Sequence, residues 1–264
     1  MEIISVINQK GGVGKTTTVI NLAAGLSQLK KRILVIDLDP QGNATTGLGL
    51  SNLDNSSDTI YGVLNGSKEI TQVIKKTKFD GLDIITSNVD LSGLEVETAD
   101  DSNRAFILKA KLTLYLNNSG GTYDYVLIDC PPSLSLLTVM ALVSSSSLLV
   151  PLQTEFFALE GLTQLMKTID RIKVNLNPDL KIRGILLTMY DKRNKLSSQV
   201  EREARNYFNE KVYSTVIPRN VRLSEAPSHG MPVLIYDKSC PGSKSYFNFT
   251  DEFINQELTK ESAA

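Results

Sequence analysis

The chain has no tryptophan, two cysteines and one histidine among its 264 residues. Cys130 and Cys240 lie far apart, and neither has the C-x-x-C partner that a zinc site, an iron–sulfur site or a disulfide framework would require. No run approaches the roughly 18 apolar residues of a membrane-spanning helix, and the first residues, MEIISVINQK, lack the basic start of a signal peptide. We therefore expect a cytoplasmic protein without a metal cluster or a membrane span.

The overall charge is also small, with a formal net charge of −1 and a pI near 6.0. A nearly neutral chain is not a polycation, so any surface that binds nucleic acid must be a local cluster of basic residues. Hydrophobic residues make up 41% of the chain, which is enough to bury one large core. We expect a single domain over residues 1–264.

Short β-branched runs alternate with helical patterns along most of the chain. Seven runs are predicted to be strands: 3–7, 32–39, 82–87, 125–130, 147–152, 183–190 and 212–217. Six further segments are predicted to be helices: 16–29, 104–118, 134–144, 158–176, 197–209 and 244–258. Nearly continuous apolar strands separated by helices are typical of a parallel sheet that is covered on both faces. The predicted fold class is therefore α/β, doubly wound, with a mostly parallel sheet.

Two segments depart from this alternation. Residues 40–80 are rich in Gly, Asn, Ser and Thr, with only short helical patterns near 58–64 and 69–76, and we expect a mobile insertion there. The last residues, about 259–264, are expected to fray.

The stretch VINQKGGVGKTTT, residues 6–18, follows the first predicted strand and opens a helix, which is the context of a phosphate-binding loop. Glycines let the backbone N–H groups approach an anion, Lys15 supplies a positive charge, and Thr16 offers a hydroxyl to Mg²⁺. The predicted nucleotide-binding residues of this loop are Lys10, Gly11, Gly12, Val13, Gly14, Lys15, Thr16 and Thr17. The first glycine of the usual G-x-x-x-x-G-K-[ST] pattern is replaced by Gln9, and Lys10 is an additional lysine.

Carboxylates end two other predicted strands. Asp129 closes the strand YVLID before two prolines, where it could hold Mg²⁺ or simply form a turn. Asp37 and Asp39 lie on the same side of the strand VIDLD, with Asp39 nearer its tip. Asp39 could orient a water for attack on a phosphate or could cap the loop, and the residues alone leave both roles open.

Positive charge gathers in residues 181–222, which contain ten basic and four acidic side chains and so carry a net charge of +6. This segment could bind the phosphates of duplex DNA without reading sequence, or it could be a solvated surface. The basic residues are not interleaved with an aromatic stacking platform, which disfavours binding of single strands by base stacking.

Six motifs follow one another along the chain: KGGVGKTT (10–17), DLDPQGN (37–43), LIDCPPS (127–133), ALEGL (158–162), LTMYD (187–191) and VIPRNVRLSEAPSHG (216–230). Together they resemble the ParA/Soj family of partitioning ATPases, within the deviant Walker A (SIMIBI) group. The resemblance covers nearly the whole chain and implies ATP and Mg²⁺ as cofactors, with Thr16 and Asp129 at the metal and Asp39 activating water. It also implies a sandwich homodimer in the ATP-bound state, in which Lys10 reaches the phosphates of the other subunit.

The same resemblance implies further contacts and partners. Met189, Pro218 and Asn220 would line the adenine pocket, and Arg193 and Arg222 would contact DNA. The expected function is an ATP-dependent switch for chromosome or plasmid partitioning on the nucleoid, in which a dimer binds double-stranded DNA nonspecifically and a ParB-type partner stimulates slow hydrolysis. Because the sequence starts at the first strand, we expect no helix-turn-helix that reads an operator.

Three alternatives belong to the same group of ATPases. A relative that positions another cargo would use identical chemistry. A MinD-like membrane switch needs a basic amphipathic C-terminal helix, whereas TDEFINQELTKESAA carries more acidic than basic residues. A nitrogenase-type reductase needs bridging cysteines, and Cys130 has no suitable companion.

Overall fold

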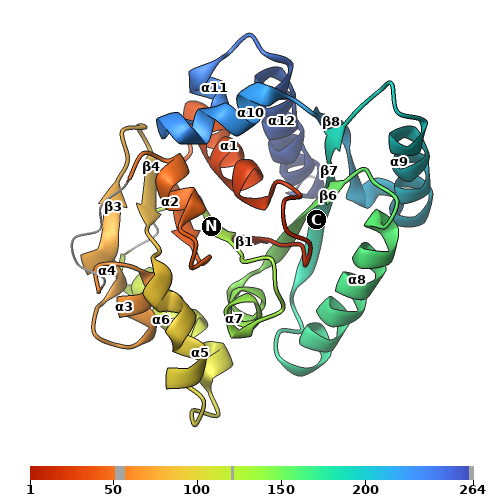
Figure 1. The fold of residues 1–264 in the computed structure, drawn as a ribbon. Coiled ribbons are helices and arrows are strands. Elements are labelled where there is room, and N and C mark those ends of the chain that lie inside the picture. The colour runs from red at the N-terminus through yellow and green to blue at the C-terminus, as the bar shows by residue number, and fades with distance from the viewer. Residues whose placement is uncertain (51–56, 120–121, 262–264) are drawn as a thin grey trace.

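The computed structural model describes residues 1–50, 57–119 and 122–261. Its strands form one sheet in the order β3-β4-β2-β5-β1-β6-β7-β8 (Figure 1). Their bounds are Glu2–Val6 (β1), Ile33–Asp37 (β2), Ile74–Lys76 (β3), Leu82–Ile85 (β4), Tyr125–Asp129 (β5), Ser147–Gln153 (β6), Lys181–Tyr190 (β7) and Val212–Pro218 (β8). Neighbouring strands are parallel except for β3, which pairs antiparallel with β4.

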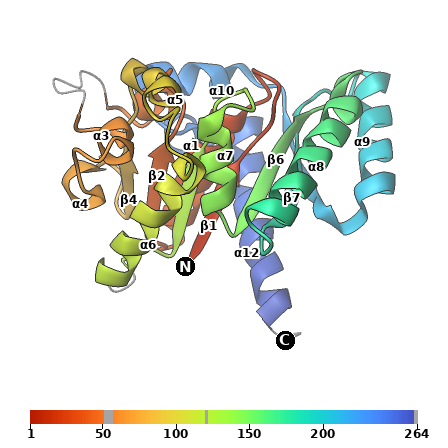
Figure 2. The same cartoon turned by 90° about the horizontal axis from the view of Figure 1, so that it is seen from below.

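The helices cover both faces of this sheet (Figures 1 and 2). The longer ones are α1 (Lys15–Gln28), α6 (Ile107–Ser119), α7 (Leu136–Ser144), α8 (Ala158–Asn175), α9 (Lys195–Phe208) and α12 (Pro241–Glu261). The shorter ones are α2 (Asn43–Gly47), α3 (Ile60–Leu64), α4 (Ile70–Val73), α5 (Leu94–Glu97), α10 (Val221–Glu225) and α11 (Val233–Tyr236). Single 3₁₀ turns lie at Val89–Gly93, Arg104–Phe106, Asn209–Lys211 and Ala226–His229.

Successive residues of each strand serve different cores, as the period of two of a strand requires. Ile33 and Val35 of β2 pack in a cluster with α1, α2, α11 and α12, whereas Leu34 and Ile36 pack against α3, α6 and α7. A third cluster joins β6 and β7 to α8 and α9. The doubly wound, mostly parallel fold predicted from the sequence is confirmed.

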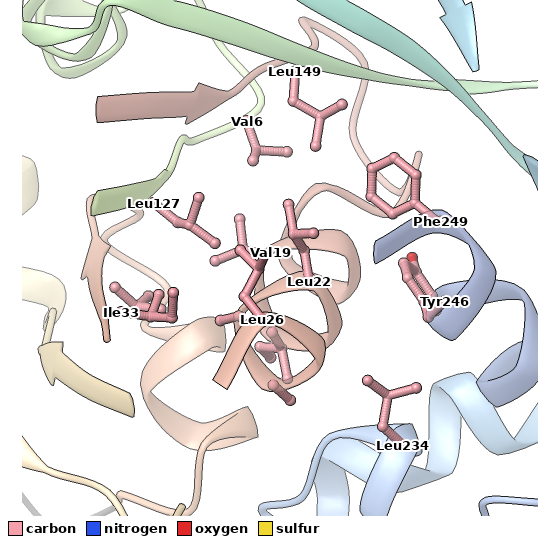
Figure 3. Packing of buried hydrophobic residues seen from close by; sticks show 14 of the residues in the cluster. Val6, Val19, Leu22, Leu26, Ile33, Leu127, Leu149, Leu234, Tyr246 and Phe249 are labelled. Atoms are coloured by element: carbon pink, nitrogen blue, oxygen red, sulfur yellow. The ribbon is translucent and has the colours of Figure 1, made fainter. Parts of the chain in front are cut away.

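The first and last long helices pack directly against each other. Figure 3 shows Leu22 and Leu26 of α1 near Tyr246 and Phe249 of α12, beneath Val6 and Leu149 of the sheet. A Cβ atom on Gly25 would lie 2.3 Å from the Thr250 hydroxyl oxygen, so only glycine permits this approach. The buried Thr18 and Tyr246 hydroxyls hydrogen-bond at 3.1 Å, which fixes α12 against the start of α1.

The segment 40–80 contains more regular structure than its composition indicates. Its described residues form α2, α3, α4 and β3, and the apolar side chains of α3 and α4 are buried in the core. The helical pattern predicted for 69–76 is wrong at its end, because Ile74 leaves the helix and pairs with Ile85 of β4. Residues 51–56 lie outside the described part, and the mobility of the segment stays a prediction.

The predictions for the tail and for the chain between β8 and α12 have different outcomes. α12 extends through residue 261, and 262–264 lie outside the described residues, so fraying of 259–264 stays a prediction. Helices α10 and α11 were not predicted, because helices of five and four residues leave no periodic pattern to detect.

Candidate functional site

The glycine-rich loop connects β1 to α1 at the carboxyl edge of the sheet. Gly12 and Gly14 have φ angles of 74° and 91°, in the left-handed region that favours glycine. Between them Val13 is buried, and its carbonyl accepts a 2.8 Å hydrogen bond from the Thr188 hydroxyl of β7. The loop is therefore anchored to the sheet by Val13, while the glycines on either side turn its N–H groups toward a ligand.

The two lysines of the loop occupy different environments. Lys15 is buried, and its ammonium donates to the Lys10 carbonyl at 3.1 Å. Burial lowers the pKa of Lys15, and the charge of Asp129 most strongly opposes that shift. The Lys10 side chain is 51% exposed and forms an ion pair with Glu155, in the turn after β6. Lys15 is thus directed into the site, whereas Lys10 lies at its open edge.

Three carboxylates lie beside this loop. Asp37 and Asp129 end the adjacent strands β2 and β5 in register, and both are fully buried. By strand alternation both belong to the face that α1 and α2 cover. Asp39 is also buried, and its carboxylate accepts the Gln41 N–H at 2.9 Å. The sheet therefore brings together carboxylates that are distant in sequence.

Neither carboxylate oxygen of Asp129 has a well-formed hydrogen bond, although both are buried. Burial and the nearby Asp37 raise the pKa of Asp129 well above its usual range, while the Thr16 hydroxyl and the Lys15 ammonium act in the opposite direction. A buried carboxylate with free lone pairs beside a threonine hydroxyl is the donor set that Mg²⁺ prefers. Thr16 and Asp129 thus fit the metal that the sequence predicts.

A cavity of about 620 Å³ opens above these groups. Among the predicted site residues, it is lined by Gly11, Gly12, Gly14, Lys15, Thr16, Thr17, Asp39, Met189, Pro218 and Asn220. Lys10, Val13 and Asp129 do not line it, because Lys10 is directed to the edge and the other two lie beneath the surface. The structure therefore brings most of the predicted nucleotide site together.

The far wall of the cavity is formed by the ends of β7 and β8. Met189 adopts a φ angle of 51°, an uncommon conformation for a residue other than glycine, at a position that lines the cavity. Asn220 lines the cavity and also caps α10, where its side chain accepts the Arg222 N–H at 3.0 Å. One end of the cavity is therefore polar with a phosphate-type loop, and the other end is partly apolar.

Several lining residues were missed from the sequence. Gln41, Asn43 and Thr46 come from the loop after Asp39 and from α2, and their closeness to Asp39 along the chain could have indicated them. Further lining residues come from α10, the following turn and α12, namely Leu223, Ser224, Pro227, Ser228 and Tyr246. Nothing local identifies these, because they meet the loop only through the tertiary fold.

The two arginines predicted to contact DNA lie on different elements, and both are exposed. Arg193, after β7, forms two 3.1 Å hydrogen bonds with Asp191. Arg222, on α10, pairs with Glu225 at 2.7 Å. Beside Arg193, a groove of about 510 Å³ is lined by Lys192, Lys195, Ser198, Gln199, Arg202 and Glu203.

Comparison with known proteins decides the family. A model of the AAA domain matches residues 1–182. The chromosome partitioning protein ParA of Caulobacter vibrioides is 50% identical over 264 residues, which cover 100% of this chain and 98% of that protein. Soj of Bacillus subtilis, a sporulation initiation inhibitor protein, is 48% identical over 251 residues, or 95% and 97% of the two chains. The chain belongs to the ParA/Soj family of chromosome-partitioning ATPases.

Solved structures share this fold over nearly the whole chain. MinD of Pyrococcus furiosus, a cell division ATPase, matches with a TM-score of 0.79 and 26% identity over 97% of this chain and 99% of that one. Cobyrinic acid a,c-diamide synthase of Mycobacterium smegmatis, solved with ADP and magnesium, matches with a TM-score of 0.80 and 34% identity over 95% and 93%. Among the residues that the structure describes, no helix has both the length and the apolar character that a bilayer span requires.

Proposed function

We propose that this protein is an ATP-dependent switch in chromosome or plasmid partitioning. ATP with Mg²⁺ occupies the cavity, a sandwich dimer forms and binds duplex DNA nonspecifically, and slow hydrolysis stimulated by a ParB-type partner releases the DNA. The observation that carries the proposal is that the loop Gly11–Thr17 and Asp39 meet at one cavity, with the buried carboxylate of Asp129 beneath it. The family membership supports the same reaction.

Within this reaction each group has a defined task. The loop N–H groups and the Lys15 ammonium bind the phosphates, while Thr16 and Asp129 hold Mg²⁺, which neutralises charge that develops on the transferred phosphoryl group. Asp39 orients the attacking water and accepts its proton. Met189, Pro218 and Asn220 enclose the base at the other end of the cavity.

The surface beside Lys10 supports a homodimer. Glu155, which pairs with Lys10, is followed by Phe156 and Phe157, whose side chains are 72% and 66% exposed. A second subunit that covered these rings would bury apolar area close to the cavity mouth. We propose that Lys10 then leaves Glu155 and contacts the phosphates of the other subunit, so that ATP and the dimer stabilise each other.

The basic surface near α9 and α10 supports the DNA step. Arg193 and Arg222 are held by neighbouring carboxylates, so DNA phosphates would have to replace Asp191 and Glu225. No ion pair of the described residues involves Lys192, Lys195 or Arg202, which are free to take up phosphate oxygens. Such contacts give binding that falls steeply with salt and carries no sequence preference. We place the working protein in the cytoplasm, on the nucleoid.

The switch is tested with Lys15→Ala and Gly12→Val, both within the loop. Because each variant disturbs the phosphate site, we expect neither to bind duplex DNA in an ATP-dependent manner, as measured by fluorescence anisotropy with and without ATP and Mg²⁺. ATP-dependent DNA binding that persisted in both would refute the switch. Hydrolysis by the wild type with and without a ParB-type protein tests the partner.

A further inference from the structure

The carboxylate of Asp37 holds the loop that carries Asp39 by hydrogen bonds. Asp37, fully buried at the end of β2, accepts hydrogen bonds on one oxygen from both the Thr45 N–H at 2.8 Å and the Thr45 hydroxyl at 2.7 Å. Its other oxygen accepts the Asp39 N–H at 3.2 Å. Because Asp39 and Thr45 stand at opposite ends of the loop, the Asp37 carboxylate fixes both ends at once.

Other contacts hold the loop as well, because the Leu38 N–H donates to the Asp129 carbonyl at 2.9 Å and Ala44 is buried in the core beside α1. α2, into which it leads, is only five residues long, and so short a helix is marginal on its own. Within the loop, Gly42 takes a left-handed φ angle of 63° and its N–H donates to the Asp39 carbonyl at 2.9 Å. Asp39, Gln41 and Asn43 all line the cavity. A displacement of this loop would therefore move several groups that face the nucleotide.

Thr45 extends the same network to the next strand. Its hydroxyl accepts the Ser87 N–H at 3.1 Å, just after β4, while it donates to Asp37. A Cβ atom on Gly42 would lie 3.2 Å from the Ser87 carbonyl, so the loop also packs closely against this strand end. Asp37, Thr45 and Ser87 form a buried chain of hydrogen bonds that connects two strands to the loop.

Asp37 itself does not line the cavity. We propose that Asp37 is a positioning residue for hydrolysis, which acts through Thr45 to hold the loop 38–45 and so to place Asp39 against the attacking water. The inference rests on the proposed function, in which Asp39 orients that water. In this role Asp37, the first aspartate of DLDPQGN, positions Asp39, the second, and does not itself contact ATP.

The experiment compares three conservative variants. Thr45→Val removes the hydroxyl and keeps the branched shape, Thr45→Ser keeps the hydroxyl, and Asp37→Asn weakens the acceptor while preserving the Thr45 to Ser87 bond. A misplacement of about 1 Å at a reacting centre can cost about 100-fold in rate. We expect Thr45→Val and Asp37→Asn to lower the single-turnover rate of ATP hydrolysis about 10- to 100-fold, and Thr45→Ser to stay within about threefold of the wild type.

ATP affinity separates positioning from a loss of structure. The dissociation constant of ATP should change less than about threefold in all variants whose circular dichroism and thermal melts match the wild type, because the loop Gly11–Thr17 is intact. In an Asp39→Ala background, Thr45→Val should cause no further loss of rate, since the effect passes through Asp39.

Three outcomes would overturn the inference. They are a wild-type rate in Thr45→Val, equal losses in Thr45→Val and Thr45→Ser, or additive losses when Thr45→Val is combined with Asp39→Ala. Should Asp37→Asn fail to fold, the two Thr45 variants still decide the matter. Failure of the proposed function looks different, because then the wild type does not hydrolyse ATP or Asp39→Ala hydrolyses it at the wild-type rate.

Discussion

Lys10→Ala should separate nucleotide binding from dimerisation. In the isolated subunit Lys15 is directed into the site, whereas the Lys10 ammonium pairs with Glu155 at the open edge. We therefore expect Lys10→Ala to change the ATP affinity of the monomer less than about twofold. The loss of the Lys10 ion pair should cost less than about 1 kcal/mol of unfolding free energy, because the lysine is 51% exposed and solvent screens the pair.

The dimer should suffer far more than the monomer. A hydrogen bond from a charged donor contributes about 1.5–3 kcal/mol. A twofold-symmetric dimer contains the lysine contact twice, so its loss weakens association by at least about 3 kcal/mol. That energy corresponds to an increase in the dimer dissociation constant of at least about 100-fold.

The measurement is sedimentation velocity over a range of protein concentrations with a non-hydrolysable ATP analogue and Mg²⁺, together with calorimetry of ATP binding to the dilute monomer. Lys109→Ala, at an exposed position on α6, controls for the loss of one positive charge. Glu155→Gln releases Lys10 without removing it, and its dimer should be at least as tight as the wild type. The reasoning is refuted if Lys10→Ala dimerises like the wild type, or if it loses as much monomer ATP affinity as Lys15→Ala.

Three further predictions concern other parts of the molecule. Asp39→Ala should reduce hydrolysis to a small residual rate in a single-turnover phosphate-release assay yet keep ATP-dependent dimers and DNA binding, and a variant unable to dimerise would show that Asp39 is structural. Because its pKa is raised, Asp129 gains a proton more readily as the pH falls, so Mg²⁺-dependent ATP binding measured by calorimetry should weaken as the pH is lowered, with binding in EDTA as the control. Gly25→Ala should lower the unfolding free energy by about 1–3 kcal/mol in urea titrations, because its Cβ meets the Thr250 hydroxyl, and Thr250→Ala in the same chain should restore most of that loss.

The phosphate-type loop could be predicted because its determinants are consecutive in the chain. The apolar strand Glu2–Val6, the glycines and the start of α1 at Lys15 all lie within one short stretch. The seven longer strands were equally accessible, since their apolar runs bury side chains on both faces of the sheet. The family and its fold followed from several such motifs in order.

The features that could not be predicted from the sequence depend on contacts between distant segments of the chain. Tyr246 lines the cavity only because α12 packs on α1, and no local pattern near either helix indicates that contact. The strand at Ile74–Lys76 exists because β4 offers an edge to pair with, which overrides the helical pattern before it. Period-two alternation places Asp37 beside Asp39, but its bonds to Thr45 depend on how the loop returns to the sheet.

The packing of α12 on α1 has a consequence for the newly made chain. Thr18 and Tyr246, whose hydroxyls meet beside the cavity, are separated by 228 positions in sequence. At about 5–20 residues per second, a ribosome needs roughly 11 to 46 s to synthesise the chain between them. Throughout that interval the glycine-rich loop is already made, but the wall that Tyr246 contributes does not exist. The complete cavity therefore forms only when nearly the whole chain has been synthesised.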